Sequence, residues 1–413
     1  MSAGAQAAGA ERLARAHLSR VVEPGDRALV PLLAEHGPVA LATRLRAGAV
    51  PDRWAVRARC LEMPTARMVS LAAGRGIRVV VPEDPDWPAG LSDLDHVAGG
   101  VACLWVRGRT PPSADRGVAV VGSRDASPYG EATAGRLGAD LASSGRTVVS
   151  GAALGIDGAA HRGALTGVGP AGTPASPGPP NAGAWVPTVA VLGCGLDRAY
   201  PSSHAGLLDR IVSAGGAVVA ELPPGSSPYP WRFPARNRVI AALSRGVVVV
   251  EAGSRSGAVG TARAADDLSR LVMAVPGPAH APRSAGCHEL LRSGADLVTS
   301  VADVLSLVGP LTSEPPAPPV DRNGPPDGTV PAAAGSAVGT APGPAGRVRR
   351  CLAAGRDRTL DEVAAMAGLD PADTRSALLD LEVAGLARRG VGGWRRAADT
   401  GAPRRAYNGP RAP

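Results

Sequence analysis

A short aromatic and basic string carries the side chains best suited to binding a nucleic acid. It reads YPWRFPARNRVIAALS, residues 229–244, and contains Phe233, the one phenylalanine of the 413-residue chain. Arg236, Asn237 and Arg238 follow at the start of an apolar helix. An aromatic ring can stack on a base while neighbouring guanidinium groups hold phosphates, as in proteins that bind single strands with little sequence preference. An equally good interpretation is that Phe233 fills the core and the arginines form a solvated face.

Glycine-containing turns supply a second set of candidate binding groups. Each follows a short apolar run, so backbone N–H groups of the turn and of the next helix could bind an anion. Arg124 in the first turn could also fork onto phosphate oxygens. One such turn is weak evidence, but four at one sheet edge predict a binding site. The turns are Gly122-Ser123-Arg124, Ser150-Gly151, Gly193-Cys194-Gly195, and the segment from Glu251 through Ser256 and Gly257 to Gly260-Thr261.

These turns do not match the common nucleotide-binding patterns. None is a G-x-G-x-x-G sequence with an acidic residue about 20 positions on, and none is a P-loop. Dinucleotides and nucleoside triphosphates bound in their usual modes are therefore disfavoured, and we expect no cofactor.

Asp157 and His161 stand four residues apart on one helix face, where they could form an acid–base or metal-binding pair. The favoured interpretation is structural: the carboxylate lies in the first turns of a helix, where it interacts well with the dipole, and the imidazole hydrogen-bonds to it. The five cysteines lie far apart with no C-x-x-C pair, so neither a zinc site nor a disulfide framework is indicated. We expect no metal and no catalytic residue.

The elements that must position these residues form a doubly wound α/β domain, which we place at residues 77–309. Apolar runs that alternate with helical stretches predict a parallel sheet covered on both faces. A stretch rich in Gly and Pro, residues 167–187, indicates a surface insertion. The runs are GVAVVGSR, RTVVSGAALG, PTVAVLGCG, GAVVAELPPG, GVVVVEAGS and LVMAVPG.

Smaller regions flank this domain. Residues 1–76 show helical spacing broken by Pro and Gly, which predicts a bundle of short helices. Residues 310–345 are rich in Pro, Gly and Ala and are predicted to be a disordered linker. Residues 398–413 form a tail.

Residues 346–397 have the pattern of a winged helix. Thr359-x-x-Glu362 is a capping box that begins one helix, and Gly368 ends it. Asp370-Pro371 supplies an N-cap and a first-turn proline for the next helix. The stretch LARRGVGGWRRA then alternates around Gly392-Gly393 like a β-hairpin.

Composition agrees with a phosphate-bearing partner. There are 44 basic and 36 acidic residues, a net charge of +8, and every basic residue is arginine. GC-rich codon usage explains an Ala-, Gly-, Pro- and Arg-rich chain equally well, so charge alone predicts only nonspecific binding. No apolar run approaches the ~20 residues of a membrane span, and the first 20 residues lack a signal-peptide core. We expect a cytoplasmic protein without membrane insertion.

The ordered strings together resemble the DNA-processing family DprA, also called Smf. The resemblance is dense over about residues 113–300 and extends faintly over VPEDPDWPAGL and CLWVRG upstream. It rests on VAVVGSRDASPYG, VVSGAALGIDGAAH, TVAVLGCGLDRAYP, ELPPGSSP, FPARNRVIAALS, VVVVEAGSRSGAVGTA, AVPG and ELLRSGADLV.

The resemblance implies an extended Rossmann-like domain that binds single-stranded DNA, forms a homodimer and loads the recombinase RecA during natural transformation. It implies that Gly122-Ser123-Arg124 and residues 233–238 lie in the DNA-binding pocket. It also implies an N-terminal domain of the SAM or helix-hairpin-helix kind and a C-terminal winged helix. The insertion at 167–187 departs from the family, and the lysines of many members must here be arginines.

Two other functions compete with this one. A nucleotide-processing enzyme of the LOG and lysine-decarboxylase-like group would need a catalytic Glu soon after its Gly-Gly-x-Gly-Thr turn. Here Gly260-Thr261 is followed by Ala262, Arg263, Ala264 and Ala265. A transcription regulator would need a basic recognition helix, but ADTRSALLDLEVAGL offers one Arg among acidic and apolar residues.

Overall fold

The computed structural model describes residues 3–168, 185–311, 347–349, 351–352, 357–383, 386–390 and 392–396. The chain divides into two compact units, Met1–Ser313 and Glu314–Pro413. The predicted insertion falls mostly, the predicted linker almost entirely and the predicted tail wholly outside the described residues.

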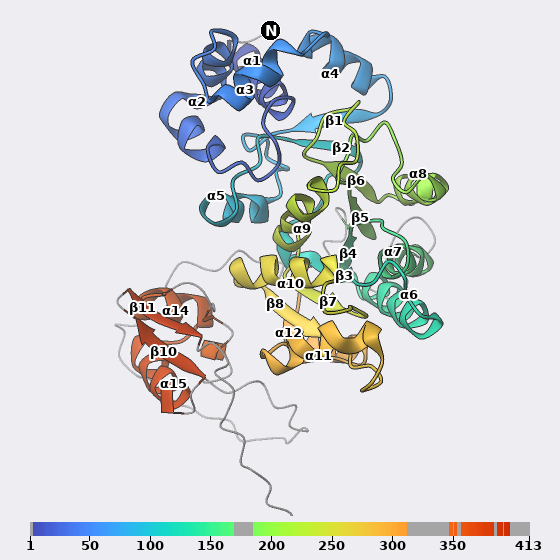
Figure 1. Cartoon of the computed structure of the whole chain (residues 1–413), viewed down its shortest axis with the longest axis vertical. Helices are drawn as coiled ribbons and strands as arrows, with labels where there is room; N and C mark the ends of the chain where they lie inside the picture. The colour runs from blue at the N-terminus through green and yellow to red at the C-terminus, as the bar shows by residue number, and fades with distance from the viewer. Residues whose placement is uncertain are drawn as a thin grey trace, which may run out of the picture. The chain divides into compact units, whose positions relative to one another are not determined.

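The first unit is built on a nine-stranded sheet with the order β1-β2-β6-β5-β4-β3-β7-β8-β9 (Figure 1). The strands from β6 to β9 in this order pair in parallel, whereas β1 and β2 add an antiparallel edge. The predicted doubly wound sheet is therefore confirmed, and the six predicted runs are β3 to β8. The strands are β1 Ile77–Val80, β2 Leu104–Gly108, β3 Gly117–Val121, β4 Thr147–Ser150, β5 Thr188–Val191, β6 Ala217–Ala220, β7 Gly246–Val249, β8 Leu271–Ala274 and β9 Asp296–Leu297.

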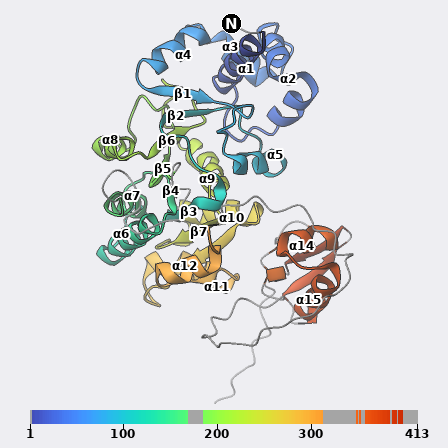
Figure 2. The ribbon, with the colours of Figure 1, turned by 180° about the vertical axis from the view of Figure 1, so that it is seen from behind.

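Helices cover both faces of the sheet because successive side chains of each central strand point in opposite directions. In β3, Ala119 and Val121 pack in one core with α9 and α10, while Val118 and Val120 pack in another core with α6, α7 and α12. Figure 1 and the reverse view in Figure 2 show α9 and α6 on opposite sides of these strands. The helices of this α/β domain are α5 Leu94–Val97, α6 Pro128–Ser143, α7 Ile156–Thr166, α8 Ala205–Ser213, α9 Arg232–Ala242, α10 Gly257–Asp267, α11 Ala285–Arg292 and α12 Val301–Val308.

The N-terminal helices share a core with the antiparallel edge of the sheet. Ala16 of α1 packs in one cluster with Ile77 of β1 and Trp105 of β2. The buried Arg15 reaches the Ala102 carbonyl at 3.3 Å, just ahead of β2. Consequently these helices and the sheet are held by common side chains. The helices are α1 Ala3–Ser19, α2 Leu29–Arg46, α3 Asp52–Arg59 and α4 Thr65–Ala73.

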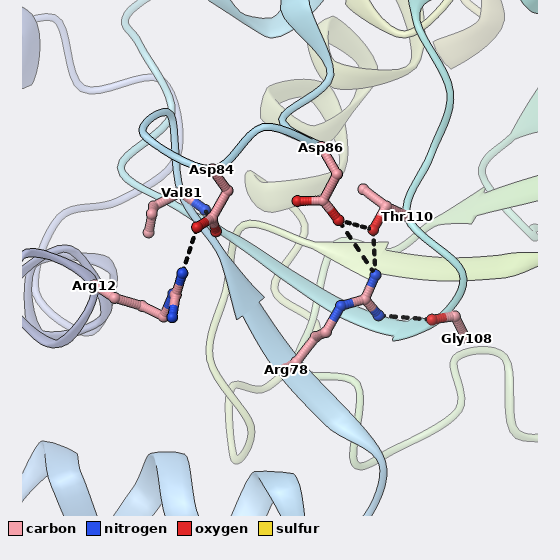
Figure 3. A network of polar contacts seen from close by, with 7 residues as sticks. All are labelled: Arg12, Arg78, Val81, Asp84, Asp86, Gly108 and Thr110. Carbon is pink, nitrogen blue, oxygen red and sulfur yellow. Dashed lines mark hydrogen bonds and ion pairs between the residues drawn. The ribbon is translucent and has the colours of Figure 1, made fainter. Parts of the chain in front are cut away.

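Polar contacts strengthen the same junction (Figure 3). Asp84, after β1, accepts a hydrogen bond from the Val81 amide at 2.9 Å and an ion-paired one from Arg12 of α1. Arg78 of β1 donates to the Gly108 carbonyl at 2.6 Å, at the end of β2. These bonds link α1 to the loop after β1, and β1 to the end of β2.

The second unit confirms the local signals of the winged helix. Thr359 and Glu362 make both bonds of a capping box at the start of α14 Leu360–Ala367, and Gly368 ends the helix in the left-handed conformation. The Asp370 carboxylate caps α15 Pro371–Val383 by accepting from the Ala372 and Asp373 amides at 2.8 and 2.9 Å. β10 Ala387–Gly390 and β11 Gly393–Arg396 pair as the predicted antiparallel hairpin.

Helices α6 and α7 approach so closely that glycine is required between them. A Cβ built on Gly163 of α7 would lie 1.9 Å from the Gly135 carbonyl oxygen of α6, and one on Gly138 would lie 2.3 Å from the Ala160 carbonyl oxygen. Backbone atoms cannot move aside as a flexible side chain can, so a methyl group at either position must push the helices apart.

We therefore expect Gly163→Ala to lower the free energy of unfolding by about 1–3 kcal/mol, the usual cost of overpacking. The matched control is Gly206→Ala on α8, where a Cβ would meet nothing within 4 Å. That control should be neutral or stabilise by up to ~1 kcal/mol, because alanine favours helix over glycine. Urea unfolding of both variants measures the difference. Equal stability of the two variants would contradict close packing at Gly163.

Candidate nucleic-acid interface

A crevice lies where the strand order reverses. From β3 the chain proceeds to β4, β5 and β6 on one side and then returns to β7, β8 and β9 on the other. The loops after β3 and β7 therefore diverge, and ligands of open α/β sheets bind at such a point. A cavity of about 870 Å³ occupies it, lined by the loops after β3 and β7 and by the first turns of α9 and α10.

Most of the predicted site residues line this crevice. Ser150 and Arg238 line neither the crevice nor a small adjoining cavity of about 80 Å³, and Gly151 lines only the small one. The predicted residues on the crevice wall are Gly122, Ser123, Arg124, Phe233, Arg236, Asn237, Ser256, Gly257 and Thr261.

The turn after β3 is fixed by backbone contacts that leave its arginine exposed. A Cβ on Gly122 would lie 2.6 Å from the Ile156 side chain and 2.8 Å from the Glu251 carbonyl oxygen, so only glycine fits. The Ser123 amide donates to the Glu251 carbonyl at 2.6 Å. Arg124 projects from this turn and has no ion-pair partner among the described residues. The turn therefore presents an unneutralised guanidinium group on a rigid support.

The turn after β7 presents a second exposed arginine beside a helix N-terminus. The Ser256 hydroxyl caps α10 by accepting from the Ala258 amide at 3.3 Å, and Gly257 begins the helix. Arg255 lines the crevice, and no ion pair to it occurs in the described part of the chain. Sequence reasoning missed Arg255, although an arginine inside a Gly- and Ser-rich turn after an apolar strand is a usable signal.

Aromatic rings form part of the crevice wall. Phe233 is partly exposed, and its ring packs against the Tyr200 ring with the centroids 5.2 Å apart. The Arg124 guanidinium carbon lies 5.1 Å from the Phe233 centroid, in cation–π distance. Tyr200 was missed because it comes from the loop after β5, far from Phe233 in sequence. A ring that adjoins an unpaired guanidinium group can accept a base beside its phosphate.

Arg236 supports the crevice from beneath. The side chain is 7% exposed, and its Nη1 donates to the Gly151 carbonyl at 2.7 Å and to the Val191 carbonyl. Burial lowers the pKa of Arg236, and the nearby Asp157 carboxylate opposes that shift. Burial conversely raises the pKa of Asp157, against the charge of Arg236 and hydrogen bonds from the Gly151 and Ala153 amides. Arg236 thus binds the carboxyl ends of β4 and β5 together.

Asn237 extends this support to the next helix. Its Oδ1 accepts from Arg236 Nε at 3.2 Å, and its Nδ2 donates to the Gly257 carbonyl at 3.1 Å. The second turn of α9 is therefore hydrogen-bonded to the first turn of α10 across the crevice.

Two predicted residues have other surroundings. Arg238 is buried, forms an ion pair with Glu221 and donates to the Gly99 carbonyl at 2.7 Å. The buried Ser150 hydroxyl donates to the Val120 carbonyl at 2.7 Å. Both side chains are used inside the protein, so neither faces the crevice.

The Asp157–His161 pair has separate partners. His161 Nδ1 lies 2.7 Å from the Thr188 hydroxyl, and burial lowers the pKa of the imidazole to about 3. Asp157 instead accepts hydrogen bonds from the Gly151 and Ala153 amides. The two residues were expected to hydrogen-bond to each other, but each has other partners. No cluster of three or more His, Cys, Asp or Glu side chains suited to a metal occurs among the described residues. Within the same residues no helix is long and apolar enough to cross a membrane.

A second aromatic pair stands beside the crevice. Tyr229 and Trp231 stack with centroids 4.6 Å apart and planes 8° apart, and their side chains are 43% and 60% exposed. Pro230 between them lines the crevice. The sequence string that starts at Tyr229 contained this signal, but exposure could not be read from it.

Fold and site together define a Rossmann-like α/β protein with a crevice of glycine turns, arginines and aromatic rings at its switch point, followed by a winged helix. The chain belongs to the DprA family: the family model described as DNA recombination-mediator protein A matches residues 78–309. A model of the DprA winged helix domain matches residues 331–393.

Similarity to individual proteins supports this assignment. A Mycobacterium tuberculosis H37Rv protein that carries the DprA name is 40% identical over 395 residues, which is 92% of this chain and 93% of that protein. Protein Smf of Escherichia coli K12 is 40% identical over 231 residues, 55% of each chain. The X-ray structure of DNA processing protein A from Streptococcus pneumoniae is 29% identical, with a TM-score of 0.54, and the match covers 71% of this chain and 95% of that one.

The buried and exposed arginines of the crevice should respond differently to substitution. Arg236→Met leaves the Gly151 and Val191 carbonyls without their donor and Asp157 without its counter-charge, which should cost about 2–5 kcal/mol of unfolding free energy. The control Arg124→Met removes the same charge from an exposed side chain and should change stability by no more than ~0.5 kcal/mol. Urea unfolding followed by circular dichroism measures both. A stable Arg236→Met protein would show that the guanidinium is not a structural link.

Proposed function

We propose that the protein binds single-stranded DNA in the crevice at the switch point and passes that strand to the recombinase RecA. The observation that carries the first part is the Arg124 guanidinium beside the Phe233 ring at the mouth of a crevice of about 870 Å³. Stacking on Phe233 requires a base whose face is free, which a paired duplex does not offer. Phosphates would bind to Arg124, Arg255 and the N-terminus of α10.

Family membership supports the rest of the proposal. Protection of incoming DNA, RecA loading, natural transformation, homodimer formation and a cytoplasmic location are what the DprA resemblance implies. No cofactor is proposed.

The acidic side chains of the crevice favour binding over catalysis. The two that line it are Asp125, which forms an ion pair with Arg283, and Asp157, which is buried against Arg236. Neither is placed as a free general base, and no carboxylate follows Gly260-Thr261 closely in sequence. The alternative of a LOG-like nucleotide-processing enzyme is therefore weaker, and hydrolysis of nucleoside monophosphates by the purified protein would revive it.

Binding to a single strand should fall with salt in proportion to the phosphates held. Two to four phosphates, at Arg124, Arg255 and helix N-termini, predict a log–log slope of about −1.4 to −2.8, since each contributes ~0.7 on single strands. Fluorescence anisotropy with a labelled oligonucleotide and its duplex at several salt concentrations measures the slope and the preference. Tighter binding of the duplex at equal salt would refute the proposal.

Phe233→Ala should weaken single-strand binding by about 1–3 kcal/mol without changing the salt slope, because stacking releases no counterions. Phe233→Leu is the informative control: it retains apolar volume but not the π face. If Phe233 only fills the core, the leucine variant should bind normally, and the alanine variant should lose about 3–5 kcal/mol of stability. If Phe233 stacks on a base, both variants should melt near the wild-type temperature and both should bind poorly. Affinity and melting temperature are measured on the same preparations.

A further inference from the structure

Another cavity, of about 760 Å³, lies among the N-terminal helices, away from the crevice. Its wall comes from α1, the ends of α2 and α3, and the start of α4. Three arginines, Arg20, Arg46 and Arg59, line it, against a single acidic residue, Glu62. The hollow therefore has an excess of positive charge.

The arginines of this cavity differ from their neighbours in how they are paired. Arg53 and Arg57 of α3 are neutralised by Asp26 and Glu23. Among the described residues, no carboxylate lies within ion-pair distance of Arg20, Arg46 or Arg59. Helix α3 thus ends on a guanidinium group that faces the cavity without a counter-charge.

Polar groups inside the cavity are arranged around Thr65. Its hydroxyl accepts from Arg20 Nη1 at 2.8 Å and lies 2.8 Å from His17 Nδ1. His17 Nε2 and Arg20 Nε are buried and have no hydrogen-bond partner among the described residues. Burial, then the charge of Arg46, then that of Arg20 lower the pKa of His17 to about 4. The two arginines are therefore close enough to make the electrostatic potential at the imidazole positive.

We propose that this cavity binds a backbone phosphate of the DNA strand that occupies the crevice. Guanidinium groups bind phosphate through paired N–H donors, and an unneutralised set of them in a hollow is the arrangement such an anion requires. The inference rests on the proposed function. The two cavities share no lining residue. A strand that reaches both must therefore be longer than the one that fills the crevice alone.

The test compares a short and a long oligothymidylate on the full chain carrying Arg46→Ala and Arg59→Ala. The short strand, about 6 nucleotides, lies at the lower end of the ~4–16 nucleotides that a single-strand site covers, and the long one has about 30. The matched control is Arg44→Ala with Arg67→Ala, which removes two exposed arginines of α2 and α4 that do not line the cavity. Both double variants lose the same net charge.

For the long strand, the Arg46/Arg59 variant should bind about tenfold or more weakly than wild type, and its salt slope should be shallower by about 0.7, the contribution of one phosphate on a single strand. Its affinity for the short strand should equal that of the Arg44/Arg67 control. Thermal melting of each variant checks that exposed substitutions have left the fold intact.

The other outcomes overturn either the role of the cavity or the proposed function. If both double variants bind the long strand equally, the cavity does not contact the strand. The same result is expected if the cavity binds a small free phosphate instead of DNA. Equal losses on the short and long strands overturn the inference in the same way. If wild-type protein binds neither oligonucleotide, the proposed function itself fails.

Discussion

The buried guanidinium of Arg236 is the interaction on which the crevice depends. Parallel strands end with carbonyl groups that no neighbouring strand bonds, and Arg236 satisfies those of Gly151 and Val191 at once. Its charge is balanced by Asp157, which in turn holds the amides of the turn after β4. A buried charge that bonds two strand ends and one carboxylate cannot be replaced by an apolar side chain without leaving those groups unsatisfied. The polar groups of Arg236 and Asp157 beneath the crevice are therefore bonded inside the protein.

The helix α9 carries both the support and the contact surface because of its periodicity. At about 100° per residue, Asn237 lies about 40° and Arg236 about 60° from Phe233 around the helix, so these three share a face. Arg238 lies about 140° away and meets Glu221 instead. The difference in direction between Arg236 and Arg238 can be calculated from the sequence alone. The prediction that both arginines hold phosphates assumed instead that residues close in sequence point the same way. Helical spacing predicts a site better than proximity in the string does.

Across the rest of the fold, features set by local sequence were predicted, and features set by contacts between distant segments were not. The six central strands were predicted from apolar runs, and the caps at Thr359 and Gly368 from local hydrogen-bond chemistry. β1, β2 and β9 were not predicted as strands, because β1 and β2 form an edge whose partner β6 is distant in sequence and β9 has only two residues. The turns of the crevice were predicted because strand direction alone brings them together. Tyr200 was not, since its contact with Phe233 depends on the path of a loop.

The net charge of +8 does not by itself locate a binding surface. Arg146, Arg236 and Arg238 are almost wholly buried and bind backbone carbonyls or carboxylates, so they add to the charge without offering it to a ligand. In a chain without lysine, arginine must serve both as an internal hydrogen-bond donor and as a surface cation. What distinguishes the two roles is pairing: Arg124 and Arg255 line a hollow with no carboxylate bonded to them among the described residues. An anion is attracted where guanidinium groups remain unneutralised at a concave surface, and that condition, rather than total charge, identifies both the crevice and the cavity among the N-terminal helices.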